Sequence, residues 1–253
     1  MLSGAGISAE SGVPTFREAQ TGLWERFSAE DLATPDAFEA DPELVWTWYR
    51  WRQSLINSVD PNPGHVALAR WQRCLGALGL GSEATEPGSW LAVATQNVDN
   101  LHERAGAEVL AHLHGSIVKH LCTQCGTEAV LPEPGYDGFT APPAAESPPA
   151  CRHCDSGVLR PGIVLFGEML PMAEFDATSA AVRASDLVIV VGTSGMVYPA
   201  AGLPLAALER GTPLVEINPE PTELSDAMDF RLRRPSGEVL PALVDAVVDR
   251  MAS

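Results

Sequence analysis

Short apolar runs alternate with helical stretches along the second half of the chain. The apolar runs suit buried strands of a parallel sheet and occupy residues 90–95, 162–166, 187–192 and 214–218. The stretches between and after them favour helices and occupy residues 173–184, 200–210 and 239–251. Gly211, directly after the second of these helices, is a typical helix stop. Strand–helix alternation of this kind predicts an α/β fold built on a doubly wound, Rossmann-like parallel sheet.

Two segments interrupt this alternation. Residues 34–86 are mainly helical in pattern, and Asp41 can cap a helix that starts at Pro42. One face of that helix would carry the apolar side chains Leu44, Trp48, Trp51 and Leu55. Residues 119–158 hold two C-x-x-C pairs and a stretch rich in Pro and Gly, which does not form regular structure by itself. We expect both segments to be insertions that form a smaller lobe.

The insertions predict how the chain divides into domains. Its 253 residues and hydrophobic content of 45% suit one large domain with inserts. The sheet domain would then consist of residues 1–33, 87–118 and 159–253, with a helical module at 34–86 and a cysteine-bearing module at 119–158.

The net charge of the chain limits the kinds of molecule that it is expected to bind. A net charge of −17 argues against a nucleic-acid binder, because such proteins neutralise phosphates with Lys and Arg, and it favours basic partners such as lysine-rich segments. No run of about 18 apolar residues predicts a membrane helix, and no secretory signal is visible at the N-terminus. We therefore expect a cytoplasmic protein that does not bind membranes, and a monomer.

A glycine turn stands near the start of the chain. Gly4, Ala5 and Gly6 open the stretch GAGISAESG, and glycines let a backbone approach a pyrophosphate at a helix N-terminus. Alone the motif is weak, since a tight loop that needs positive φ would look the same. A strand should precede such a turn, yet only Met1, Leu2 and Ser3 do. We expect either an earlier native start or an unusually short first strand.

Four of the five cysteines form a metal-binding pattern. Two C-x-x-C pairs can supply four thiolates to one tetrahedral Zn²⁺, and they are Cys122, Cys125, Cys151 and Cys154. Four protein ligands leave no position open for a catalytic water, so the predicted zinc is structural and the module is a zinc ribbon. A redox dithiol is the alternative interpretation.

Several motifs in a fixed order give the chain a family resemblance. They are GAGISAESGVPTFR at 4–17, TQNVDNLH at 95–102, HGS at 114–116, GTS at 192–194 and EINP at 216–219. With the cysteine quartet between His114 and Gly192, this set resembles the sirtuin family of NAD⁺-dependent protein deacylases over almost the whole chain. The resemblance implies that the sheet domain binds NAD⁺ and that the substrates are acyl-lysine proteins or peptides.

The resemblance implies roles for residues at the cofactor. The expected NAD⁺-binding residues are Gly4, Ala5, Gly6, Glu10, Phe16, Arg17, Gln96, Asn97, Asp99, Gly192, Thr193, Ser194, Asn218, Pro219, Glu220 and Ser236. Without the motif, core packing would be the better interpretation of Phe16, and Asp99 could equally cap the helix expected at 100–105. By the same resemblance Asn97 and Asp99 form the nicotinamide pocket.

His114 is the expected general base. An imidazole titrates near neutrality, which suits it to accept a proton from a ribose hydroxyl. The HGS context separates His114 from the other five histidines, which we interpret as structural: His65, His102, His112, His120 and His153.

The resemblance also places residues at the acyl-lysine. Val164, Phe166, Gly167, Glu168 and Val197 match the two sides of the cleft in which the substrate backbone adds as a strand.

The chemistry of the acyl group depends on a further motif. Tyr49 and Arg52 lie three apart on the helix after Pro42, beside its apolar stripe, and resemble the Tyr-x-x-Arg of class III sirtuins. A guanidinium can bind the terminal carboxylate of a succinyl or malonyl group, and Ala19 matches the small residue that widens that pocket. A surface arginine paired with an acid is the competing interpretation.

Three rival functions remain compatible with parts of this pattern. The same scaffold could transfer ADP-ribose to a protein. A zinc ribbon could serve as a non-catalytic interaction module, and a Rossmann-like domain could belong to a nicotinamide oxidoreductase. The complete set of cofactor motifs favours a deacylase with some deacetylation retained.

Overall fold

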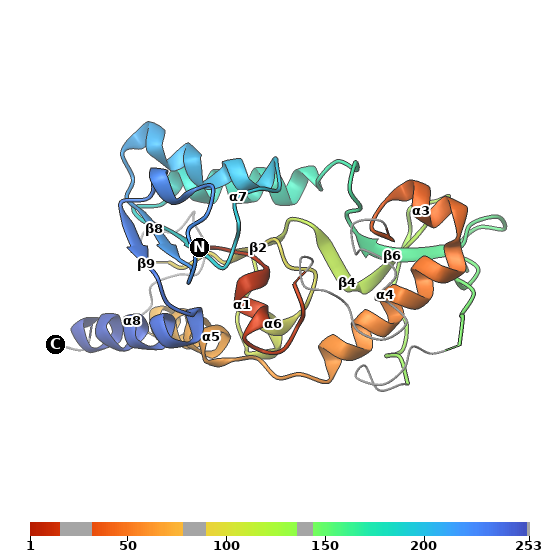
Figure 1. Ribbon diagram of the computed structural model, residues 1–253, viewed down its shortest axis with the longest axis horizontal. Coiled ribbons are helices and arrows are strands. Elements are labelled where there is room, and N and C mark those ends of the chain that lie inside the picture. Colours follow the sequence, from red (N-terminus) through yellow and green to blue (C-terminus); the bar gives the residue numbers. More distant parts are fainter. Residues whose placement is uncertain (16–31, 78–89, 136–143, 252–253) are drawn as a thin grey trace.

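The molecule has a large sheet lobe and a smaller lobe at its other end (Figure 1). Its structure is a computed structural model that describes residues 1–15, 32–77, 90–135 and 144–251. No helix in these described ranges is long and apolar enough to cross a membrane.

Six described strands form the large sheet in the order β3-β2-β1-β7-β8-β9. Every pairing in it is parallel. The strands are β1 (Leu2–Ser3), β2 (Ala94–Thr95), β3 (Ala111–His112), β7 (Val188–Val191), β8 (Leu214–Ile217) and β9 (Phe230–Leu232). In chain order this is the 3-2-1-4-5-6 arrangement of a doubly wound fold, and the order reverses between β1 and β7. The predicted Rossmann-like sheet is confirmed.

Helices cover both faces of this sheet because its central strand is apolar on both sides. Val188 and Val190 of β7 pack in one cluster with Val182 of α7 (Met172–Ala184) and Ala207 of η2 (Ala200–Arg210). Ile189 and Val191 point the other way, into the cluster that holds side chains from α5 (Pro63–Ala77) and α8 (Ser236–Met251).

The smaller lobe contains a second, antiparallel sheet. Its described strands run in the order β5 (Glu128–Ala129), β4 (Gly115–Cys122) and β6 (Leu159–Ile163). The expectation of a parallel strand at 162–166 is therefore wrong. Apolar composition does not define strand direction; here β4 leads into the first cysteine pair and β6 follows the second, so the cysteine module brings the two together antiparallel.

Two consecutive helices complete the smaller lobe, α3 (Pro35–Ala40) and α4 (Pro42–Asn57). The predicted cap of α4 is confirmed, since Asp41 Oδ1 accepts the Leu44 amide at 3.0 Å. Trp48, Trp51 and Leu55 are buried in the largest core cluster of the lobe, while Trp46 packs from α4 against the cysteine module.

The boundary of the helical module stays a prediction. Leu68 and Leu75 of α5 belong to the core cluster of the parallel sheet rather than to that of α3 and α4. The packing therefore favours a helical module that ends before Pro63.

Three short helices lie at loops near the strand ends: α1 (Ala5–Ala9), α6 (Leu101–Arg104) and η3 (Ser225–Ala227). The expected helix at 200–210 is a 3-10 helix, and Gly211 ends it with φ of 66°. The last helix begins at Ser236, three residues before its predicted start.

Candidate nucleotide-binding and catalytic site

The glycine turn lies at the point where the strand order reverses. The Gly6 amide donates to the Gly192 carbonyl oxygen at 2.7 Å, which joins the loop after β1 to the loop after β7. A Cβ at Gly6 would lie 2.7 Å from Gly192 Cα, and one at Gly4 would lie 2.7 Å from Thr193 Cβ. Only glycine fits at both positions, because the two loops are in contact.

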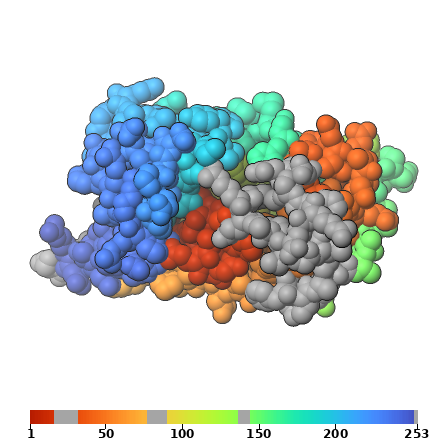
Figure 2. Space-filling model, in the orientation of Figure 1, coloured from red at the N-terminus to blue at the C-terminus, as the bar shows by residue number. Residues whose placement is uncertain are grey.

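A pocket of about 390 Å³ opens beside this turn. Its lining residues are Gly6, Ala9, Glu10, Gly192, Ile217, Asn218, Pro219, Glu220, Pro235 and Ser236. Most of them are predicted cofactor residues, brought together from four separate parts of the sequence. Ala9, Ile217 and Pro235 were not predicted; each is adjacent to a predicted residue, which is the only sequence feature that could have identified them. Figure 2 shows the N-terminal residues in red beside the blue C-terminal part.

Glu10 connects the glycine turn to the last helix. Its carboxylate accepts hydrogen bonds from Ser236 Oγ and from the Gly237 amide, at 3.0 Å for the latter. A carboxylate is favoured at a helix N-terminus, where backbone amides lack partners. Glu10 therefore has a capping role in addition to any contact with a nucleotide.

Side-chain amides connect the loops after β2, β7 and β8. Gln96 Nε2 donates to Thr193 Oγ1 at 3.2 Å, and Asn218 Nδ2 donates to the Thr193 carbonyl oxygen at 3.1 Å. Ser194 Oγ accepts the Met196 amide at 3.4 Å within its own turn. These polar groups lie at the carboxyl ends of parallel strands, where open α/β sheets bind ligands.

Asn97 and Asp99 are both buried next to the first helix. Asn97 Nδ2 donates to Ser8 Oγ at 2.9 Å. Asp99 Oδ1 accepts the Leu101 amide at 3.1 Å, but the N-cap of the helix that starts at Leu101 is Asn100, so the alternative of Asp99 as the N-cap is wrong by one residue. Burial raises the pKa of the Asp99 carboxyl, while hydrogen bonds from Leu101 and Ser8 oppose the rise.

His114 has one ring nitrogen fixed by the backbone. Its Nδ1 lies 2.9 Å from the Gln96 carbonyl oxygen. A carbonyl can only accept, so Nδ1 carries the proton and Nε2 of the neutral ring is left as a proton acceptor. Burial lowers the pKa of His114, with a partial offset from the bond to Gln96. This is the state that a general base requires.

The residues predicted to bind the substrate strand differ in their surroundings. The side chains of Phe166 and Val197 are exposed. Glu168 is bound to Arg160 Nη2 at 2.8 Å and to the Leu165 amide at 2.8 Å, which gives it a structural role. Gly167 has φ of 93°, which suits a glycine. The Val164 amide donates to the His114 carbonyl oxygen at 2.9 Å and so links this segment to the backbone of His114.

Tyr49 and Arg52 are buried, with exposed fractions of 2% and 5%. Burial therefore extends beyond the apolar stripe, to most of the side chains of α4 between Val45 and Ile56. The competing interpretation of Arg52 as a surface arginine is wrong. Arg52 lies over the Trp48 ring at 5.4 Å and donates to the Pro14 carbonyl oxygen at 3.1 Å. Within the described residues, the Tyr49 hydroxyl is buried without a hydrogen-bond partner.

Three predicted residues lie outside the described part of the chain: Phe16, Arg17 and Ala19. Ala5 is described and exposed, and it starts α1 directly after Gly4.

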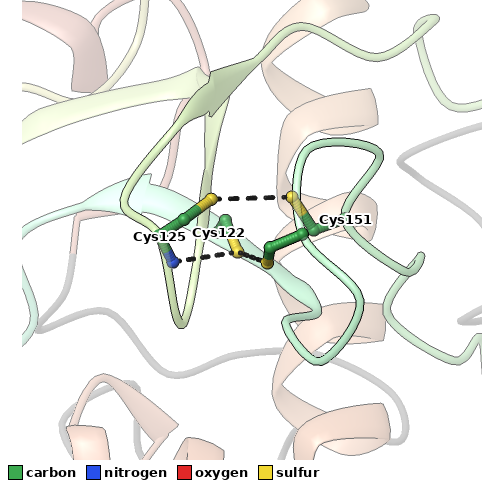
Figure 3. Close-up of side chains that lie close together, drawn as sticks. Cys122, Cys125 and Cys151 are labelled. Atoms are coloured by element: carbon green, nitrogen blue, oxygen red, sulfur yellow. Dashed lines mark hydrogen bonds between the residues drawn. The ribbon is translucent and has the colours of Figure 1, made fainter.

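The four cysteines converge from two facing loops (Figure 3). Their sulfurs all lie within 4.8 Å of one another, with Cys122–Cys154 at 3.5 Å and Cys125–Cys151 at 3.8 Å. A tetrahedral zinc with Zn–S bonds of about 2.3 Å separates its sulfurs by roughly 3.8 Å. The quartet is thus positioned to bind one zinc ion, and all four cysteines are free of disulfides.

Comparison with known proteins places the chain among related sequences and structures. Residues 4–199 match the model of the Sir2 family. NAD-dependent protein deacylase 2 of Pyrobaculum aerophilum is 47% identical over 99% of this chain and 91% of its own length. NAD-dependent protein deacylase Sir2 of Mycolicibacterium smegmatis is 46% identical over 96% and 94%.

Solved structures agree with the sequence relatives. A crystal structure of a Sir2 homologue in complex with NAD has 43% identity and a TM-score of 0.83, over 100% of this chain and 89% of that one. A Sir2 homologue in complex with ADP ribose gives the same TM-score at 42% identity, over 99% and 92%. The family match and the extent of these similarities show that the chain belongs to the Sir2 family, the sirtuins.

Proposed function

We propose that the chain is an NAD⁺-dependent protein-lysine deacylase that favours succinyl and malonyl groups and retains some deacetylase activity. The observation that carries the proposal is the hydrogen bond of His114 Nδ1 to the Gln96 carbonyl oxygen, which holds the ring at the segment that also carries Asn97 and Asp99. Relatives named NAD-dependent protein deacylases over nearly the whole chain support it.

The proposed chemistry assigns one task to each group. NAD⁺ supplies the ribose carbon to which the acyl oxygen bonds as nicotinamide leaves. Asn97 and Asp99 hold nicotinamide in the required pose. His114 accepts at Nε2 the proton of a ribose hydroxyl, and the hydroxyl oxygen then bonds to the acyl carbon. Water completes the release of free lysine and 2′-O-acyl-ADP-ribose.

The glycine turn and the loops after β7 and β8 supply the nucleotide site. The pocket beside this turn is lined by Gly6 and Gly192 and by Asn218. Such a surface suits a ribose and a pyrophosphate. Glu10 and Ser236, bonded to each other, hold α8 against this pocket.

The preference for acidic acyl groups depends on Tyr49 and Arg52. A buried guanidinium is a strong partner for a carboxylate, because the interaction is little screened by water. A buried hydroxyl without a partner costs free energy unless a ligand completes its hydrogen bonding. The terminal carboxylate of a succinyl or malonyl lysine would accept a hydrogen bond from the Tyr49 hydroxyl and would also pair with the Arg52 guanidinium.

The partners follow from charge and family. A net charge of −17 favours basic, lysine-rich substrates and disfavours nucleic acid. A solved Sir2 structure that holds a deacetylated p53 peptide supports an acyl-lysine protein or peptide as substrate. We infer a cytoplasmic monomer as the working form.

Mass spectrometry of the protein with NAD⁺ and matched acetyl- and succinyl-lysine peptides tests the proposal. The expected result is free lysine, nicotinamide and acyl-ADP-ribose, formed faster from the succinyl peptide. ADP-ribose attached to the peptide would favour the transferase alternative, and NADH without nicotinamide release would favour an oxidoreductase. Either outcome overturns the deacylase assignment.

A further inference from the structure

Two histidines bind consecutive carbonyl groups of the turn that carries Asn97. His114 Nδ1 lies 2.9 Å from the Gln96 carbonyl oxygen, and His112 Nδ1 lies 3.3 Å from the Asn97 carbonyl oxygen. The two rings lie two residues apart, at the end of β3, and so reach the same turn. The two rings differ in the hydrogen-bond partner of the second ring nitrogen, Nε2.

The second nitrogen of His112 faces a carboxylate. His112 Nε2 lies 2.6 Å from Glu103 Oε1 on α6. A carbonyl oxygen and a carboxylate oxygen both accept, so the ring satisfies both only when each nitrogen carries a proton. These two contacts favour the imidazolium form of His112. The pKa of His112 is raised by Glu103, by the Asn97 carbonyl and by Asp99, against the effect of burial.

The imidazolium completes a set of bonds around Asn97. The Asn97 amide donates to Thr95 Oγ1 at 3.0 Å, and its side chain donates to Ser8 Oγ at 2.9 Å. With the bond from His112, the backbone amide, backbone carbonyl and side chain are all held, which fixes the peptide plane and the side-chain direction.

The charge of His112 also acts on its surroundings. The titratable groups near it are Glu103 and His102 on α6 and Asp99 after β2. The cation favours the ionised form of Asp99, because its charge lowers the pKa of that carboxyl while burial raises it.

We propose that the His112–Glu103 pair is a positioning device for the nicotinamide pocket, which holds the Asn97 peptide and the Asp99 carboxylate in place only while His112 is protonated. The inference rests on the proposed function for its consequence in catalysis, and His112 itself touches no reacting group. Turnover should then fall as pH rises through the titration of His112.

The first test needs no activity. NMR of the ¹³C-labelled histidine rings, with His112→Asn to identify the resonance, should show His112 titrating above the ordinary value of about 6.5. The amide nitrogen of Val98 lies on the peptide whose carbonyl His112 holds, and it should titrate with the same midpoint. In Glu103→Gln both midpoints should move to lower pH, while Glu108→Gln, on the nearby exposed surface, should leave them unchanged.

The second test follows turnover of the full-length protein. The alkaline limb of the kcat profile should move to lower pH in Glu103→Gln and disappear in His112→Asn, whose amide keeps a donor for Asn97 but has no charge to lose. His112→Ala should raise the nicotinamide concentration for half inhibition about tenfold, as for one lost charge-assisted hydrogen bond. A purely structural role would lower stability in these variants without moving the limb.

Two outcomes overturn the inference: a His112 ring that titrates at or below the ordinary value near 6.5, or a Val98 amide that does not follow the ring. Wild-type protein that releases no nicotinamide from NAD⁺ would instead refute the proposed function, and the NMR titration would still decide the state of the pair. An unchanged alkaline limb in Glu103→Gln, with the ring shifted, would refute the link to catalysis.

Discussion

Gly157 lies against the Cys122 sulfur so closely that a Cβ at Gly157 would overlap it. The same Cβ would lie 3.0 Å from the Cys154 sulfur. Gly157 is thus part of the wall that fixes two of the four sulfurs in position. No cysteine motif identifies it, because its contribution is the absence of a side chain.

Gly157→Ala should therefore weaken zinc binding by about 10-fold to 100-fold, as displacement of a supporting residue commonly does. Because zinc binding is coupled to folding of such modules, the melting temperature should fall with the zinc content. Elemental analysis and thermal unfolding measure both. Gly135→Ala is the matched control, since a Cβ there meets no atom within 4 Å. Full zinc content in Gly157→Ala would contradict the prediction.

His114 should keep its base form at unusually low pH. Burial lowers its pKa, so the neutral ring persists below the ordinary value near 6.5. The acid limb of kcat/KM for NAD⁺ and acyl peptide should lie below that value. His114→Tyr should remove turnover while circular dichroism shows an intact fold. An acid limb at or above 6.5, or full turnover in the variant, would rule out His114 as the base.

Arg52→Met should reduce desuccinylation far more than deacetylation. Burial makes a charge costly to keep, so an apolar side chain of similar length should leave the fold intact. The ratio of kcat/KM for succinyl and acetyl peptides measures the effect. Arg50→Met, on the same helix but bound to Gln53 and Pro132, serves as the control. Equal loss of both activities in Arg52→Met would count against the acyl assignment.

Tyr49→Phe tests the same pocket without touching a charge. The Tyr49 hydroxyl has no partner among the described residues, so its removal breaks no hydrogen bond within that part of the chain and should not lower stability. The KM for the succinyl peptide should nevertheless rise about tenfold, because the carboxylate loses one hydrogen bond. Destabilisation with an unchanged KM would show a purely structural hydroxyl.

Sequence patterns predict the parts of this fold that local chemistry determines. The α4 cap at Asp41 and the stop at Gly211 follow from one or two residues, and both are found where expected. The β7 run is apolar on both faces, so it suits a parallel sheet that is covered on both sides. The glycine turn and the cysteine quartet are likewise local motifs with few structural solutions.

Other features depend on contacts between distant residues. The run at 162–166 gives no indication of direction, and β6 pairs antiparallel because β4 and β6 flank the cysteine pairs. Tyr49 and Arg52 are buried because two clusters enclose α4, one of them beside the zinc site. The state of His112 depends on Glu103 and the Asn97 carbonyl together, so sequence alone gave it only a structural role.

The buried pair His65 and His102 should make the protein sensitive to acid. Their ring centroids lie 4.8 Å apart in an edge-to-face arrangement, and His102 Nε2 lies 2.9 Å from Ser3 Oγ. Burial is the main cause that lowers the pKa of His65 to about 4 and that of His102 to about 3. Above the unfolded value near 6.5 both rings are neutral in either state, so they add no pH dependence.

Below pH 6.5 the unfolded chain binds protons that the folded protein excludes, so the free energy of unfolding should fall steadily until about pH 3. The loss from the two rings is on the order of several kcal/mol. Urea unfolding between pH 4 and 7 measures it as a slope. His65→Asn should give a shallower slope than wild type, whatever its stability at neutral pH, because one excluded proton is gone. An equal slope in the two proteins would show that His65 is not the group that titrates.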